Sequence, residues 1–125
     1  MTSLAQAHLL ATSIRTILAD TDAADTHVTI DAMEVPAHAQ TGAILIQVEK
    51  VLFPHWTPSE PEAEFQVHVI AGPQDRPLVA WQRMDKIIAA LHHGGLNIDR
   101  ATPSTFAPGT MPALPAFTLD LNPLD

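Results

Sequence analysis

The longest β-strand signal in the chain is the segment AILIQVEKVLF at residues 43–53. Ile44, Ile46 and Val48 share one face of such a strand, whereas Val51 and Phe53 fall on the opposite parity. Successive side chains of a strand point to opposite faces, so this change of phase near residues 49 and 50 predicts a bulge or a sharp bend. The segment is therefore expected to form a long strand that bends in its second half.

Two helices are predicted on either side of this strand. Residues 3–19 repeat apolar side chains at steps of three and four, and residues 77–93 do the same, with a proline at the start and a glycine pair at the end. Shorter alternating segments predict strands at residues 28–32, 65–69, 96–102 and 116–121. The order α-β-β-β-α-β-β is no strict alternation, so we expect an α+β fold with two helices packed on a mostly antiparallel, twisted sheet.

Prolines gather in two stretches that we expect to be long loops, at residues 54–61 and 103–115. Both stretches carry large apolar side chains, which either fold back on the core or serve as anchors of a protein–protein contact. The second interpretation makes six residues candidates for an interface with another subunit or partner: Phe53, His55, Trp56, Phe106, Met111 and Leu114.

Composition and charge limit the class of protein. The chain has 125 residues, 46% of them hydrophobic, which is enough for one domain, residues 1–125, with a single core. Acidic residues outnumber Lys and Arg by 14 to 6, and the net charge of −8 argues against a general nucleic-acid binder and against docking on anionic lipid. There is no cysteine, hence no disulfide, thiolate metal site or cysteine nucleophile. The N-terminal residues do not resemble a signal peptide, and no apolar run is long enough to predict a membrane span, so we expect a soluble protein.

The candidates for chemistry are sparse. His27 and His68 lie on predicted strands and approach each other only if those strands pair, with Asp31 as a third ligand; this would make a small metal-dependent enzyme. No serine lies in a nucleophile elbow and no glycine-rich phosphate loop occurs. We therefore expect neither an enzyme nor a bound cofactor.

Three segments carry a resemblance to a known family. They are WQRMDKIIAAL at residues 81–91, GGLNIDRA at residues 94–101 and the closing LPAFTLDL at residues 114–121. Together with the order of the elements, they resemble the tail terminator proteins of long-tailed, siphovirus-type bacteriophages, and the closing segment is similar to the last strand of actinobacterial phage examples. The resemblance is best in the C-terminal half of the chain and topological before it. Other neck components, such as head–tail adaptors and tail-completion proteins, share the fold and remain an alternative.

This resemblance implies a structural virion protein. It implies a ring, usually a homohexamer, that caps the tail tube, ends tube polymerisation and joins the tail to the head connector at the neck. The implied partners are further copies of the chain, the major tail tube protein and the head–tail connector or stopper, assembled in the cytoplasm of a bacterial host. DNA would pass through the ring without specific binding, and the alternating Glu60, Glu62 and Glu64 are candidates for an acidic lumen wall. The family has no catalytic residues.

Overall fold

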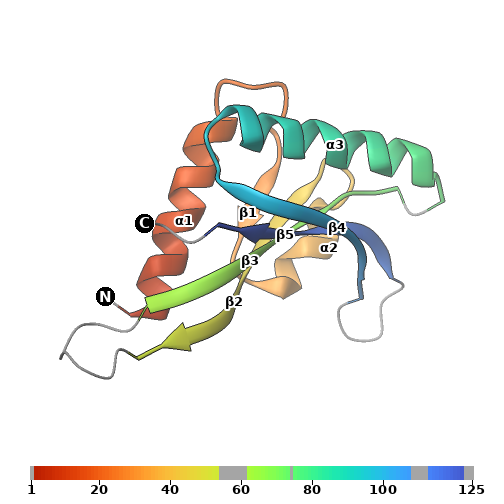
Figure 1. Ribbon diagram of the computed structural model, residues 1–125. Coiled ribbons are helices and arrows are strands. Elements are labelled where there is room, and N and C mark those ends of the chain that lie inside the picture. Colours follow the sequence, from red (N-terminus) through yellow and green to blue (C-terminus); the bar gives the residue numbers. More distant parts are fainter. Residues whose placement is uncertain (1, 54–61, 74, 108–112, 123–125) are drawn as a thin grey trace.

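The computed structural model describes residues 2–53, 62–73, 75–107 and 113–122. It is an α+β fold, as expected, in which a five-stranded sheet is covered by helices (Figure 1). The order of the elements is α1 (Ser3–Leu18), β1 (His27–Thr29), a 3-10 turn (Ala32–Glu34), α2 (Val35–His38), β2 (Ala43–Leu52), β3 (Glu62–Ile70), α3 (Pro77–His93), β4 (Ile98–Phe106) and β5 (Leu114–Leu121).

The strands lie side by side in the order β1-β2-β3-β5-β4. Only β1 and β2 run parallel, and the other three pairs are antiparallel, which confirms the mostly antiparallel sheet. The register of β2 against β3 shifts between Val48 and Lys50, so the bulge predicted from the change of phase is confirmed.

The main core lies between one face of the sheet and the two long helices, α1 and α3 (Figure 1). Each helix directs its apolar stripe at the sheet, and the residues that meet there are nearly inaccessible to solvent. They include Ile14 and Leu18 of α1, Met84, Ile87 and Leu91 of α3, and Ile44, Val67, Val69 and Leu119 of the strands. The predicted helices are confirmed to within a residue, and the turn after α3 uses Gly95 at φ +96°.

A smaller core covers part of the opposite face. Val35 of the short helix α2 packs there on Ala43 and Leu45 of β2 and on Ile70 of β3. This helix was not predicted, and the strand expected at residues 28–32 ends at Thr29. Thr29 Oγ1 accepts the N–H of Asp31, whose own carboxylate accepts the N–H of Met33, and these bonds turn the chain out of the sheet.

The prediction of one long loop over residues 103–115 is wrong. Strand β4 runs to Phe106 and β5 begins at Leu114, with Pro103 in register with Phe117 and Pro115 in register with Thr105. Pro115 precedes the residues of β5 that pair with β3, which begin at Ala116. For Pro103 the reason is that β4 is the outermost strand of the sheet. An edge strand tolerates a proline because its missing N–H can face away from the neighbouring strand.

Candidate assembly interface

The hairpin formed by β2 and β3 is longer than the strands on either side of it. Strand β1 pairs with β2 only as far as Leu45, and β5 pairs with β3 only from Gln66 onward. Residues 48–52 and 62–65 therefore form a two-stranded extension, here called the hairpin arm, whose β3 side begins beside the N-terminal end of α1 in Figure 1. An isolated two-stranded ribbon is marginally stable in water, so the arm depends on other contacts.

Few contacts within the described part of the chain hold the arm. The N–H of Ala63 donates to Gln6 Oε1 of α1 over 3.1 Å, and Phe65 packs against the main core. Lys50 Nζ lies 3.4 Å from Glu64 Oε2 across the two strands. Both side chains of this ion pair are largely exposed, so it contributes at most about 1 kcal/mol.

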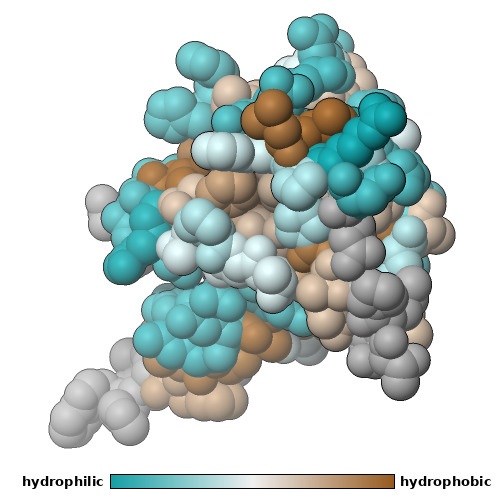
Figure 2. All heavy atoms as spheres, turned by 90° about the vertical axis from the view of Figure 1, so that its right-hand side faces the viewer, coloured by the Kyte–Doolittle hydropathy of each residue, from teal (hydrophilic) through white to brown (hydrophobic). Residues whose placement is uncertain are grey.

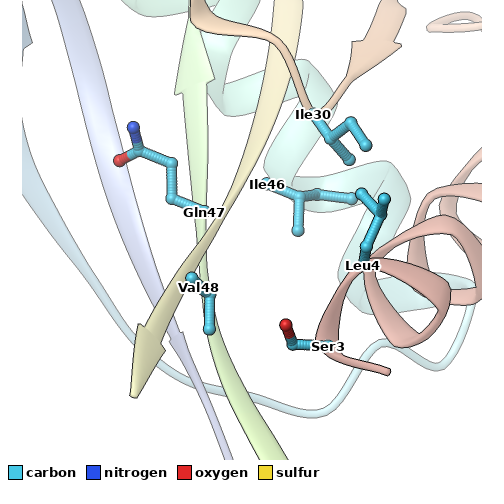
Figure 3. A pocket seen from close by; sticks show the side chains of 6 residues that line it. All are labelled: Ser3, Leu4, Ile30, Ile46, Gln47 and Val48. Carbon is cyan, nitrogen blue, oxygen red and sulfur yellow. The ribbon is translucent and has the colours of Figure 1, made fainter. Parts of the chain in front are cut away.

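An open groove of about 500 Å³ runs between the outer edge of β2 and the start of α1. Ser3 and Leu4 of α1 and Ile30, just after β1, line one side, and residues 46–48 of β2 line the other. In Figure 3, Leu4, Ile30 and Ile46 point toward one another, whereas Gln47 points to the opposite side of the strand. The groove therefore lies where β1 would have continued along β2, and its side opposite β2 is formed by the apolar Leu4 and Ile30 with Ser3 beside them.

Apolar side chains are exposed around this edge. Val48 is 51% exposed, Leu52 43% and Phe53 68%, and Leu4 at the mouth of the groove is 59% exposed. An exposed apolar cluster beside an unpaired strand edge is typical of an interaction surface. Of these residues, only Phe53 was predicted from the sequence to lie in an interface. The sequence pattern of a strand does not show where the helices that cover it end.

The other predicted interface residues have mixed positions. Phe106 and Leu114 pair at the ends of β4 and β5 and pack partly buried against the smaller core, so they are not the exposed loop side chains that the prediction assumed. His55, Trp56 and Met111 lie outside the described residues.

The acidic candidates lie on the hairpin arm. Glu62 and Glu64 are two residues apart on β3, so they share a face of the strand as predicted. Glu62 is exposed, and Glu64, whose side chain is 41% exposed, has Lys50 as its partner. The third candidate, Glu60, falls outside the described residues.

The hypothetical metal site is not assembled. Strand β2 lies between the strands of His27 and His68, so the pairing that the hypothesis required is absent. His27 instead stacks on the ring of His38 at 3.8 Å between centroids and contacts Glu34 Oε1 through Nε2 at 3.0 Å. This hydrogen bond lowers the pKa of Glu34 below its usual value. Within the described residues, no three His, Asp or Glu side chains are arranged to hold a metal ion.

The uncovered part of the second sheet face carries a polar line across three strands. Thr118 Oγ1 of β5 lies 3.0 Å from His68 Nδ1 of β3 and 3.1 Å from Ser104 Oγ of β4. The other nitrogen, His68 Nε2, is buried and has no hydrogen-bond partner among the described residues. Burial lowers the pKa of His68, and the charge of Asp120 opposes this shift.

This shift predicts a pH dependence of stability. In the unfolded chain His68 takes up a proton near pH 6.5, and in the folded chain only at lower pH. Between these two pKa values the unfolded state binds more protons, so the His68 contribution to stability falls as the pH drops below about 6.5. When the pH is lowered from about 7.5 to about 5.5, across the pKa of an unfolded histidine, the melting temperature of the wild type should fall. The melting temperature of His68→Gln should fall less. His8→Gln, at an exposed histidine of α1, is the control. An equal loss in all three proteins would contradict the assignment.

A second exposed apolar patch lies at the start of α3. Leu78 is 63% exposed and Trp81, one turn later, is 54% exposed. Figure 2 shows hydrophobic atoms gathered near the top of this side of the molecule, where α3 begins. Trp81 lies in one of the segments that resemble tail terminators, and this patch was not predicted from the sequence.

In comparisons with protein families and with curated proteins, no family and no curated protein matches this chain. None of the described helices is long and apolar enough to cross a membrane. By its fold and its surface, the chain is an α+β protein whose sheet has free edges, with exposed apolar side chains beside the edge of β2.

Proposed function

We propose that this chain is a structural subunit of a bacteriophage tail, a tail terminator that assembles into a ring, of six copies in the family it resembles. The observation that carries this proposal is the hairpin arm, with its unpaired strand edge and exposed apolar side chains. The resemblance of residues 81–91, 94–101 and 114–121 to tail terminators supports it.

A ring requires a contact between two different patches of the same chain. Such a heterologous contact closes on itself when the rotation between copies allows it. The free edge beside the groove is one apolar patch, and the exposed side chains at the start of α3 offer a second surface for the tail tube or the head connector. The proposed partners are therefore further copies of the chain, the major tail tube protein and the connector.

The acidic balance of the chain suits a channel for DNA. With a net charge of −8, the surface has few cations to bind phosphates, so a passing duplex would not be retained. We propose Glu62 and Glu64, together with Glu60, for the wall that faces the channel. No catalytic step and no cofactor belongs to this role.

Self-association of the purified chain tests the proposal. We expect native mass spectrometry and sedimentation velocity to detect closed oligomers, either of the chain alone or after addition of the tail tube protein. Assembly should weaken when Phe53 is replaced by serine, because this exposed side chain lies at the end of the arm. Ala89→Ser, at an exposed position of α3, is the control. A chain that stays monomeric with and without tube protein would refute the proposal.

Electron microscopy of particles assembled without this chain separates a terminator from the other neck components. Loss of a terminator should give abnormally long tails or tails without heads, because tube growth is no longer stopped. Loss of a head-stopper or adaptor should instead leave heads that release their DNA. Tails of normal length that remain attached to heads would exclude both roles.

A further inference from the structure

We propose that the free edge of β2 pairs antiparallel with the outer edge of β4 in a neighbouring copy, so that the sheets of adjacent subunits join. This inference rests on the proposed ring and names the contact that would build it. The two edges are different surfaces of the same chain, as a head-to-tail contact requires.

Both edges are available in the described part of the chain. On β2, residues 46–52 have no neighbour on the outer side once β1 has ended opposite Leu45. On β4, which closes the other side of the sheet, the outer edge is unpaired along its whole length. Unpaired N–H and C=O groups of an edge strand can accept a strand of another chain.

The two edges are irregular at matching places. Strand β2 has an extra residue, Glu49, between Val48 and Lys50, and β4 has an extra residue, Asp99, between Ile98 and Arg100. A bulge bends its strand and increases the local twist, so a straight strand would fit neither edge. In an antiparallel pairing with Val48 opposite Ala101, the two bulges lie next to each other, offset by one residue.

The same register matches the chemistry of the side chains. Charges of opposite sign come together twice, because Glu49 faces Arg100 and Lys50 faces Asp99. On either side of them, apolar residues face apolar ones and polar residues face polar ones. The remaining pairs are Val51 with Ile98, Val48 with Ala101, and Gln47 with Thr102. Opposite-charge and apolar cross-strand pairs stabilise a sheet, whereas like charges destabilise it.

The faces of the two sheets agree in this register. Gln47 is in register with Gln66, and Thr102 with Thr118, so both lie on the polar face of their own sheet. Val48 is in register with Phe65 and Ala101 with Leu119, and both of these partners belong to the helix-covered face. A shift by one residue would turn the polar side chains of one copy toward the helices of the other.

The incoming strand would lie in the open groove beside β2. The groove lies along β2 beside Ile46 and Val48, with Leu4 and Ile30 on its far side (Figure 3). In the proposed register the helix-side residues of the incoming strand are Ala101 and Pro103, whose small apolar side chains fit this apolar wall. Pro103 has no N–H and stands opposite Ile46, near the place where β1 already occupies the edge, so the pairing ends there.

Pairing of β2 with β2 of a second copy fits less well. An antiparallel pairing centred on Glu49 would place two carboxylates directly opposite each other, which destabilises a sheet. It would also be a symmetric contact, which makes a dimer and leaves no open end for further copies. Charge and shape therefore favour the outer edge of β4 as the partner of the free edge of β2.

Cysteine cross-linking tests the register, and the natural chain has no cysteine that would interfere. Gln47→Cys and Thr102→Cys are prepared as separate full-length variants, mixed at a concentration at which the chain self-associates, and oxidised. Directly opposite residues lie about 5 Å apart between Cα atoms, within reach of a disulfide. We expect a covalent heterodimer from the mixture, and a ladder of larger covalent oligomers from the variant that carries both substitutions.

The control pairs Gln47→Cys with Ser104→Cys, which lies on the same face as Thr102 but two residues away. In the proposed register these Cα atoms are about 8 Å apart, beyond the reach of a disulfide. We expect at least about tenfold less cross-linked product, in line with that geometric limit. Oligomers that form without cross-linking at residues 47 and 102, or that cross-link equally at the shifted pair, overturn this register while the ring stands. A chain that never self-associates, with or without tube protein, overturns the ring and this contact together.

Discussion

Replacing Ile44 by alanine is expected to lower the free energy of unfolding by about 2–5 kcal/mol. Ile44 lies in the middle of the sheet, in register with Val28 of β1 and Val69 of β3, and its side chain is fully buried in the main core. The loss combines the transfer free energy of the removed methyl groups with the cavity that the two helices cannot fill. Because a domain of this size is stabilised by about 5–15 kcal/mol in total, the variant would be partly unfolded at moderate denaturant concentrations.

Val48 on the same strand provides the matched control. It faces the same side as Ile44 but is 51% exposed, since it lines the open groove beside the start of α1. Val48→Ala should therefore change the free energy of unfolding by at most about 1 kcal/mol. Urea unfolding followed by circular dichroism measures both variants. Similar losses in the two would mean that the arm is as well packed as the sheet centre, and the argument for a free edge would fail.

The sequence predicts those parts of the fold that depend on local periodicity. The apolar stripes of residues 3–19 and 77–93 repeat over four or more turns, so both helices were placed to within a residue. The bulge in β2 was visible for the same reason, because one extra residue reverses the parity of every side chain after it. These signals need no knowledge of what packs on them.

Features that depend on distant segments were not predicted. Pro103 was assigned to a loop, since nothing local indicates that β4 is an edge strand, where a proline is tolerated. The parallel pairing of β1 with β2 likewise depends on α2, which covers four residues and has too short an apolar pattern to be recognised. Val48 shares the parity of the core residues Ile44 and Ile46, and only the folded chain reveals that about half of its surface is exposed.

Replacing Ala101 by proline is expected to prevent the strand contact between copies while leaving each copy folded. The natural chain supplies the precedent, because Pro103 already lies in β4 and is paired with Phe117 of β5. Residues two apart in a strand direct their N–H groups to the same side. A proline at position 101 therefore removes an N–H from the outer edge of β4 and leaves the pairing with Leu119 intact.

The effect on assembly should be large. In the proposed register Ala101 lies opposite Val48 at the centre of the contact, where the proline ring would meet the incoming backbone and at least one ladder hydrogen bond would be lost. We expect the association constant to fall at least tenfold, equivalent to about 1.4 kcal/mol per contact. Sedimentation velocity over a range of concentrations measures this loss, and thermal melting monitors the fold.

Two further substitutions show whether a loss of assembly comes from the missing N–H on the outer edge of β4 or from damage to the strand itself. Ala101→Thr changes the same side chain but keeps the N–H, so it should assemble more tightly than Ala101→Pro. Thr102→Pro removes an N–H from the side of β4 that faces β5, so it should lower the melting temperature of the single copy. If Ala101→Pro assembled as tightly as Ala101→Thr, the outer edge of β4 would play no part in joining the copies. If it melted as early as Thr102→Pro, its N–H would belong to the β4–β5 pairing and the assignment of the two edges would be wrong.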